Sequence, residues 1–408
     1  MPWPLPNWRR LLVADSTMTV RNTECLRRIG IWGVLLLALV ACASPVCAAP
    51  PPDAIIFEDD LQLQELESAL TRSLIALRTV PPTTRYPVAG QMVPVQRLID
   101  SALHLQRFIQ SRPSADAVHH EIQKAFEAIE VSRGADAAPI RMLITGYYQP
   151  IFPGSLSRQP PYIHPLYRMP DDLLIRQTNG RKQVLGRREQ GKIVPYWTRR
   201  DIEQGNLLQG QELVWLKDPF DAFVLHIQGS GIIRLPDGSR RGVHYAVNNG
   251  RDYRSIGKYL VDTGRMQLAE VTMDTIRRYI DQHPGEREQI LHHNDSFVFF
   301  HWSAPGPAIG NLGRELTPGR SIAADQRWYP PGSLVFLDSR RPVMAKGSVV
   351  EWQRMRRLVT VQDTGSALTG PGRIDIFWGT GDQAGEEAGQ MKEAGAAHLL
   401  LLKEGFRE

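Results

Sequence analysis

The chain contains very little cysteine, and its three cysteines, Cys25, Cys42 and Cys47, all lie near the amino terminus. The long segment after them therefore holds no disulfide, no thiolate metal site and no cysteine nucleophile. The sequence also lacks any apolar run of the roughly 20 residues that cross a bilayer as a helix. Disulfide-stapled miniproteins, cysteine enzymes and multi-span membrane proteins are thereby excluded.

An excess of charge of one sign is nearly absent as well. The 48 basic and 43 acidic residues give a formal net charge of +5, and omitting residues 1–41 leaves 43 bases and 41 acids. No stretch combines basic and aromatic residues in the way that nucleic-acid binding requires, so we expect no nucleic-acid partner. An apolar fraction of 42% in 408 residues is enough for two domains with a sizeable core.

The amino terminus has the features of an export signal. Two arginines precede the apolar run 29–41, which is too short to span a membrane and ends in small residues. The segment Leu39–Cys42 resembles a bacterial lipobox, in which the signal is cut before a cysteine that is then acylated. We predict a signal peptide over residues 1–41, a lipid anchor on Cys42 and a linker over residues 42–60. Ordinary cleavage near Ala49 is the alternative, and translation starts at Met1 or Met18.

Hydrophobic periodicity predicts a mostly β chain preceded by helices. Apolar residues at three- and four-residue steps predict three amino-terminal helices, over residues 63–77, 95–109 and 118–129. Short apolar runs separated by turn signals then predict strands. These runs cover residues 142–148, 183–185, 212–216, 222–228, 231–235, 296–301, 333–337, 358–362, 374–378 and 398–402. Further helices are predicted over residues 255–262, 273–280 and 384–394, and Asp237 with Gly238 predicts a hairpin turn.

The segment from Val361 to Phe377 contains the most informative residues. Asp375 stands between Ile374 and Ile376 on a predicted strand, so its side chain points away from the face that those two residues bury. A carboxyl group partly withdrawn from water has a raised pKa, as a general acid near neutral pH requires. A solvated strand aspartate is the alternative interpretation.

Two motifs in this region are also found in other enzyme classes. Asp363–Ser366 matches the aspartic-protease signature by letters, but that chemistry needs two such loops, and Asp262–Gly264 ends a helical pattern instead. A protease stays an alternative in which a second copy of the chain supplies the other loop. Gly379–Ala384 resembles a dinucleotide fingerprint, yet too few residues follow it to complete a dinucleotide-binding fold. We predict that these glycines let a helix pack closely on the sheet.

Several polar and aromatic segments predict a cleft for sugars. Gly146–Pro150 is a turn with two tyrosines, and His226–Gly231 ends a predicted strand in amide and small residues. Sugars bind to aromatic faces and to amide groups. The histidines have no metal-ligand spacing, so we expect no metal site and no cofactor.

Taken together, several motifs resemble one known family. Asp325, Asp363–Gly365 and Arg373–Asp375 resemble the three-aspartate (3D) domain. Four further segments are similar to the family of membrane-bound lytic murein transglycosylase A (MltA). They are Gly146–Tyr148, Gln228–Gly231, Tyr253–Lys258 and Ser296–Phe300.

The resemblance implies a two-domain fold with a substrate groove. A double-psi β-barrel would comprise residues 61–146 and 296–408, with the 3D domain at about 321–403, and a smaller β-domain, 147–295, would be inserted into it. The spacing between Asp363 and Asp375 looks one residue longer than in relatives, which the turn at Pro371 and Gly372 can absorb.

The resemblance also implies an activity and a location. The enzyme would cleave the β-1,4 bond between N-acetylmuramic acid and N-acetylglucosamine in peptidoglycan and leave a 1,6-anhydro end. Asp375 would act as acid and then base, supported by the other two family acids, Asp363 and Asp325. Tyr148 and Gln228–Ser230, which include Gly229, would contact glycan strands. The protein would be a monomeric lipoprotein on the periplasmic face of the outer membrane of a Gram-negative bacterium.

Two other functions stay open on the sequence. A hydrolytic muramidase would pair Asp375 with Asp363 or Asp325 and use water. A non-catalytic barrel would bind peptidoglycan without cutting it.

Overall fold

The computed structural model describes residues 55–131, 142–178, 181–365 and 367–406. The predicted signal peptide, Cys42 and the first part of the predicted linker lie outside the described residues. Within the described residues, no helix is both long enough and apolar enough to span a membrane.

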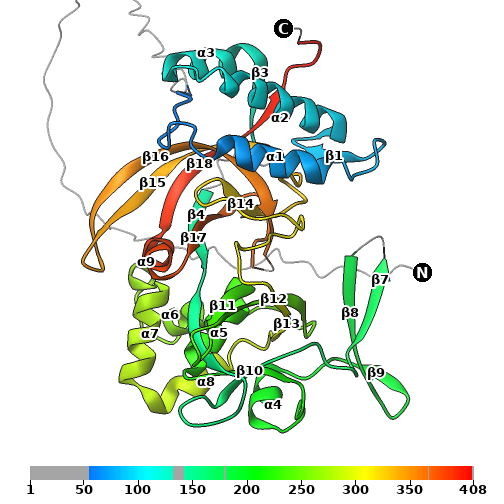
Figure 1. The fold of residues 1–408 in the computed structure, drawn as a ribbon, viewed down its shortest axis with the longest axis vertical. Coiled ribbons are helices and arrows are strands. Elements are labelled where there is room, and N and C mark those ends of the chain that lie inside the picture. Colours follow the sequence, from blue (N-terminus) through cyan, green and yellow to red (C-terminus); the bar gives the residue numbers. More distant parts are fainter. Residues whose placement is uncertain (1–54, 132–141, 179–180, 366, 407–408) are drawn as a thin grey trace, which may run out of the picture. The chain divides into compact units, whose positions relative to one another are not determined.

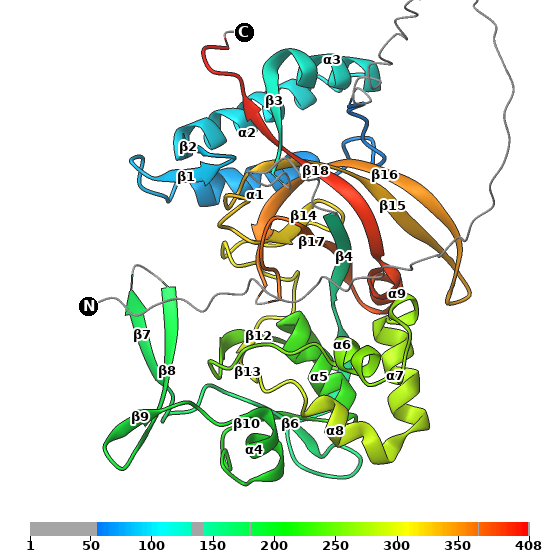
Figure 2. The ribbon, with the colours of Figure 1, turned by 180° about the vertical axis from the view of Figure 1, so that it is seen from behind.

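Six strands close into a barrel. Their hydrogen-bonded order is β15-β16-β14-β17-β4-β18, and β18 pairs back onto β15, so the ring has no free edge. The barrel strands are β4 (Met142–Gln149), β14 (Ser321–Ala324), β15 (Leu334–Ala345), β16 (Ser348–Asp363), β17 (Arg373–Thr380) and β18 (Lys392–Leu402). Figure 2 shows the long β15–β16 ribbon alongside β18. The mostly β fold with amino-terminal helices is therefore confirmed.

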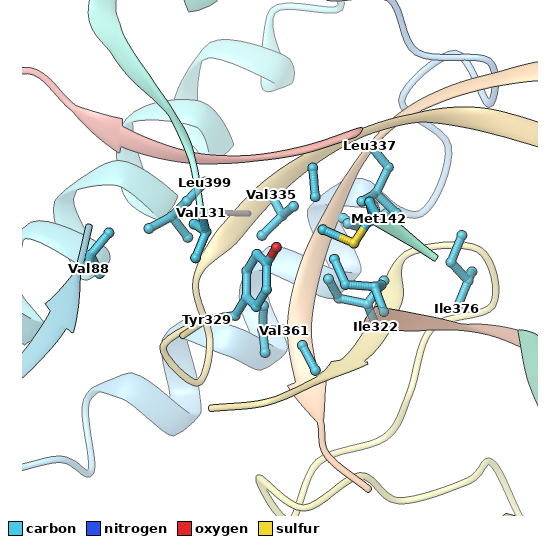
Figure 3. Close-up of a cluster of buried hydrophobic side chains, with 14 of the residues drawn as sticks. Val88, Val131, Met142, Ile322, Tyr329, Val335, Leu337, Val361, Ile376 and Leu399 are labelled. Atoms are coloured by element: carbon cyan, nitrogen blue, oxygen red, sulfur yellow. The ribbon is translucent and has the colours of Figure 1, made fainter. Parts of the chain in front are cut away.

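The barrel interior is filled by alternating apolar side chains. On β17, Ile374 and Ile376 are fully buried, as are Val335 and Leu337 on β15, because alternate residues of a strand face the same side. Figure 3 shows this cluster, which also surrounds Tyr329. The Tyr329 hydroxyl donates to the carbonyl oxygen of Pro371 at 3.0 Å, so this buried polar group is paired.

Three helices cover one side of the barrel (Figure 1): α1 (Leu66–Leu77), α2 (Val95–Gln110) and α3 (Ala115–Ala125). They match the three predicted amphipathic segments, except that the third helix ends at Ala125. Residues predicted to continue it form β3 (Phe126–Glu130), which pairs with β18. The prediction was wrong there because pairing with β18 determines the conformation of these residues, and a partner so distant in the sequence has no effect on local hydrophobic periodicity. A short hairpin of β1 (Arg85–Val88) and β2 (Gln91–Pro94) precedes α2.

The segment before α1 is held to the barrel by buried ion pairs. Arg320 has a fully buried side chain and donates to both carboxylate oxygens of Asp59, at 2.6 and 2.8 Å. Arg357 pairs in the same way with Asp60, at 2.8 and 2.5 Å. Residues 57–60, the end of the predicted linker, are therefore part of the folded barrel.

A second, six-stranded sheet has the order β13-β12-β11-β5-β10-β6. Its strands are β5 (Ile151–Ser155), β6 (His164–Tyr167), β10 (Glu212–Leu216), β11 (Ser230–Arg234), β12 (Arg240–Asn248) and β13 (Val298–Ser303). A separate three-stranded sheet holds β7 (Leu174–Thr178), β8 (Arg181–Glu189) and β9 (Lys192–Val194). The helices of this part of the chain are α4 (Arg199–Gln204), α5 (Pro219–Gln228), α6 (Ile256–Asp262), α7 (Met273–Gln282) and α8 (Arg287–Leu291), with short 3₁₀ turns at Leu268–Glu270 and Pro284–Glu286. The predicted hairpin turn at Asp237 and Gly238 is confirmed between β11 and β12.

The predicted strand over residues 222–228 is wrong, because these residues lie in helix α5. The Asp218 side chain accepts from the N–H of Phe220, Pro219 occupies the first turn, and Gly229 ends the helix at a φ of 73°. These are start and stop signals of a helix. The helix packs between two apolar clusters, so it is apolar on several faces and shows no clear period.

The carboxyl-terminal helix is also shorter than predicted. Helix α9 spans Asp382–Gln390, and β18 begins at Lys392 instead of residue 398. Gly379 and Gly381 precede α9 with φ values of 123° and 91°, and a Cβ atom at either position would meet no other atom closer than 3.5 Å. The turn conformation therefore requires these glycines, whereas we had predicted close helix packing.

Candidate active site

Six of the seven site residues predicted in the folded part of the chain line a single cavity of about 380 Å³, which we call the acid cavity. They are Asp375, Asp363, Tyr148, Gln228, Gly229 and Ser230. The seventh, Asp325, does not line it. The fold thus brings together side chains that are more than 200 positions apart in the sequence, such as Tyr148 and Asp375.

Asp375 lies on β17 with its carboxyl group turned toward the acid cavity. Its side chain is 19% exposed, between neighbours that are fully buried in the barrel. Thr145 on the adjacent strand β4 donates a hydrogen bond to Oδ1, and Arg373 Nε lies 3.4 Å from the same oxygen. Burial raises the pKa of Asp375, although Arg373 and the Thr145 hydroxyl partly oppose this by favouring the carboxylate. A proton can therefore reside on this group at a higher pH than on an ordinary aspartate.

Asp363 ends strand β16 in the same cavity. Its Oδ1 accepts from the N–H groups of Thr364 at 2.9 Å and Asn311 at 3.0 Å, and its Oδ2 accepts from the Tyr147 hydroxyl at 3.1 Å. Burial raises the pKa of Asp363 to about 6, despite these donors. Thr145 and Tyr147 are two residues apart on β4, so one face of one strand holds both acids.

Asp325 is buried just after β14 and forms hydrogen bonds with the loop that precedes β17. Its carboxylate accepts from Arg327 at 2.5 Å and from the N–H of Gly370 at 2.7 Å. These donors, led by Arg327, lower the pKa of Asp325 to about 2. The ionised group therefore fixes the loop that leads into β17, and its contacts are those of a residue that positions others.

The end of α5 also lines the acid cavity. The Gln228 side-chain oxygen accepts from the N–H of Tyr148 at 3.2 Å, which joins the end of α5 to β4. Tyr148 is pressed against α9, because a Cβ atom on Gly385 would lie 2.7 Å from the tyrosine ring. The aromatic ring and the amide are thus held rigidly beside the acids.

A second cavity of about 610 Å³, which we call the side cavity, adjoins the acid cavity. The two share four lining residues: Tyr148, Gln228, Tyr253 and Arg373. Aromatic rings and hydrogen-bonding side chains line both, which is the chemistry that binds sugars. Together they provide a long polar and aromatic surface beside Asp375.

Sequence analysis missed Thr145, and it named Tyr147, Tyr253 and Arg373 inside longer motifs without giving them a role. Thr145, Tyr147 and Arg373 contact the two acids, and Tyr253 lines both cavities. A role for Arg373 could have been assigned, because it stands two residues before Asp375 on one strand and so shares its face. Asn311 contributes only a backbone N–H, which no residue type encodes.

No cluster of three or more His, Cys, Asp or Glu side chains suited to a metal ion occurs in the part of the chain that the structure describes.

Comparisons with known proteins agree with this arrangement. The chain matches the MltA specific insert domain over residues 143–301 and the 3D domain over residues 320–401. It is 31% identical over 263 residues to membrane-bound lytic murein transglycosylase A of Escherichia coli, a match that covers 64% of this chain and 66% of that protein.

Solved structures are similar over nearly their whole length. The structure of Escherichia coli MltA with bound chitohexaose has a TM-score of 0.64 and 25% identity, and the match covers 87% of this chain and 93% of that one. The lytic transglycosylase LtgG of Burkholderia pseudomallei is 31% identical with a TM-score of 0.50, over 84% of this chain and 91% of that one.

Proposed function

The chain belongs to the MltA family, and from this we propose that it is a lytic transglycosylase of peptidoglycan with Asp375 as its single acid and base. Its relatives carry the name lytic murein transglycosylase, and one of them was solved with a chitin oligosaccharide. The observation that carries the proposal is the position of Asp375, a largely buried carboxyl group with a raised pKa on the wall of the acid cavity. The enzyme would cleave the β-1,4 bond between N-acetylmuramic acid and N-acetylglucosamine.

The reaction needs only one carboxyl group. Protonated Asp375 donates its proton to the glycosidic oxygen as the bond from C1 to that oxygen breaks through an oxocarbenium-like state. The resulting carboxylate then accepts the proton of the 6-hydroxyl group of the same sugar, whose oxygen bonds to C1. The product is a 1,6-anhydro ring, and no water is consumed. Thr145 and Arg373 stabilise the carboxylate that exists between the two proton transfers.

The remaining predicted residues have supporting roles in this proposal. Asp363, held by Tyr147 and two backbone N–H groups, supports the positive charge of the transition state electrostatically. Asp325 positions the loop before β17. Tyr148 and the segment Gln228–Ser230 contact the glycan.

The amino terminus fits a membrane-bound enzyme. Relatives are named membrane-bound, and Cys42 would carry the lipid that holds the chain to the periplasmic face of the outer membrane. We place the barrel domain at residues 61–146 and 296–408 with residues 147–295 inserted, except that β13 (Val298–Ser303), which pairs with β12, belongs with the inserted sheet. We take the enzyme to act as a monomer.

A hydrolytic muramidase is the second candidate, because Asp363 occupies the same cavity as Asp375. Most glycosidases place two carboxyl groups beside the glycosidic bond, and the second one activates water or forms a covalent bond with the sugar. The two candidates differ in their products and not in their binding site.

Product analysis decides between them. Purified sacculi are digested with the protein, and the released muropeptides are separated and weighed by mass spectrometry. We expect 1,6-anhydromuramic ends, which weigh one water less than reducing ends. Reducing ends would establish the muramidase, and an intact sacculus with bound protein would indicate a binding barrel without activity.

The pH dependence provides a further prediction. Because Asp375 must begin the cycle protonated, activity should fall as the pH rises through its elevated pKa. A Thr145→Val substitution removes a donor to the carboxylate, so it raises this pKa and should move the alkaline limb upward by about one pH unit. Initial rates of sacculus solubilisation between about pH 4 and pH 8 measure the limb. Thr145→Ser keeps the hydroxyl and is the matched control. Identical profiles for the valine and serine variants would contradict the assignment.

A further inference from the structure

The cation beside Asp375, Arg373, has no ion-pair partner among the described residues other than Asp375 itself. Among the described residues, three arginines line the acid and side cavities. Arg199 is buried and donates to Glu203 at 2.8 Å and to two backbone carbonyls. Arg277 pairs with Asp218 and Asp221. Arg373 has only the 3.4 Å approach of its Nε to Asp375, and no other described residue accepts a hydrogen bond from its side chain.

The position of Arg373 suits a ligand. Its side chain is 37% exposed and lines both cavities, so it faces the space where a bound glycan would pass the reacting bond. Two acids line the side cavity, Asp274 and Glu386, and neither forms an ion pair with Arg373 in the described part of the chain; Asp274 is bonded to Arg278. A guanidinium group presents a planar fork of N–H donors that matches a carboxylate better than it matches a sugar hydroxyl. We therefore expect the guanidinium group of Arg373 to pair with an anionic group on the substrate.

We propose that Arg373 is a specificity-determining residue that binds a carboxylate carried on O3 of the muramic acid residue next to the cleaved bond. The inference rests on the proposed function. Muramic acid differs from glucosamine by the lactyl ether on O3, which ends in a carboxylate in peptide-free strands and continues into a carboxylate-bearing stem peptide in intact murein. Asp375 acts at C1 of this sugar, and Arg373 lies on the same face of β17 two residues away. It therefore distinguishes murein from chitin-type glycans, which lack any such group.

Binding without cleavage tests the proposal. Titration calorimetry is performed on the Asp375→Asn protein with three ligands: chitohexaose, a peptide-free murein hexasaccharide and the same strand with stem peptides. Adding Arg373→Gln should weaken murein binding by about 10- to 100-fold, the usual effect of losing a charge-assisted pair, and leave chitohexaose binding unchanged. Arg373→Lys should restore part of the loss. Weakening confined to the peptide-bearing strand identifies a stem-peptide carboxylate, and weakening confined to the peptide-free strand identifies the lactyl carboxylate. Weakening of both murein ligands shows that Arg373 binds either carboxylate.

The controls separate this proposal from simpler explanations. Arg354→Gln removes the same charge from β16 at a side chain that is 62% exposed and lines neither cavity, and it should change no affinity. Equal weakening of chitohexaose and murein by Arg373→Gln would overturn the proposal, because the arginine would then bind sugar in general. Should the double variant unfold, the KM of single Arg373→Gln on peptide-bearing strands and the inhibition constant of chitohexaose give the same comparison. Anhydro products from the wild type would confirm the proposed function whichever way this test ends.

Discussion

Asp375→Asn is expected to reduce the release of soluble muropeptides from sacculi by at least about 10³-fold. General acid–base catalysis contributes roughly 10² to 10⁴, and here one group performs both the acid and the base step. Asparagine has nearly the same shape, and its side-chain oxygen can still accept from Thr145, so the barrel should keep its fold. The measurement is the initial rate of muropeptide release, accompanied by thermal unfolding and by binding of chitohexaose to the variant.

The matched comparison is Asp363→Asn. In a transglycosylase, this variant should lose less activity than Asp375→Asn, because Asp363 supports charge without moving a proton in the reaction. Both variants should bind chitohexaose. Full lytic activity in Asp375→Asn would remove the catalytic assignment, and equal loss in both variants together with reducing ends in the products would establish the muramidase.

The largest expected effect on stability comes from Asp59→Asn. The substitution leaves the fully buried guanidinium of Arg320 without its carboxylate partner, and breaking a buried pair on one side costs about 3–5 kcal/mol. The free energy of unfolding, measured by denaturant titration of the folded protein, should fall by that amount. Asp262→Asn is the control, because Asp262 pairs with Lys258 at the surface and its loss should cost about 0.5 kcal/mol or less. Similar losses in the two variants would contradict a buried pair.

The residues of the acid site could be predicted from the sequence more accurately than the bounds of several helices and strands. Asp375 could be placed on its strand because alternation of apolar residues reports directly which face is buried. Helix α5 was missed because it is buried on several faces and so lacks the 3.6-residue hydrophobic period of an amphipathic helix. Its capping residues, Asp218 and Gly229, were the sequence features that indicated a helix. β3 was missed because its partner β18 lies some 270 positions away in the sequence, beyond the reach of any local pattern.

The support of the site was the least predictable part. The donors to Asp363 include the backbone of Asn311, and Thr145 reaches Asp375 only because β4 pairs in parallel with β17. Such contacts depend on the order of the strands in the barrel, which cannot be predicted from the local patterns of a single sequence. Arg373 is the exception, since strand geometry alone places it beside Asp375.

The closure of the barrel has a consequence for how the enzyme is made. β18 is the last strand along the residues that the structure describes, and it is the one that joins β15 to β4. A polypeptide that emerges amino terminus first therefore has an open ring until residues 392–402 appear, and until then β4, which carries Thr145, is paired on one side alone, with β17. A copy clipped before residue 392 should therefore lack the closed barrel on which Asp375 stands, and we expect it to release no muropeptides from sacculi.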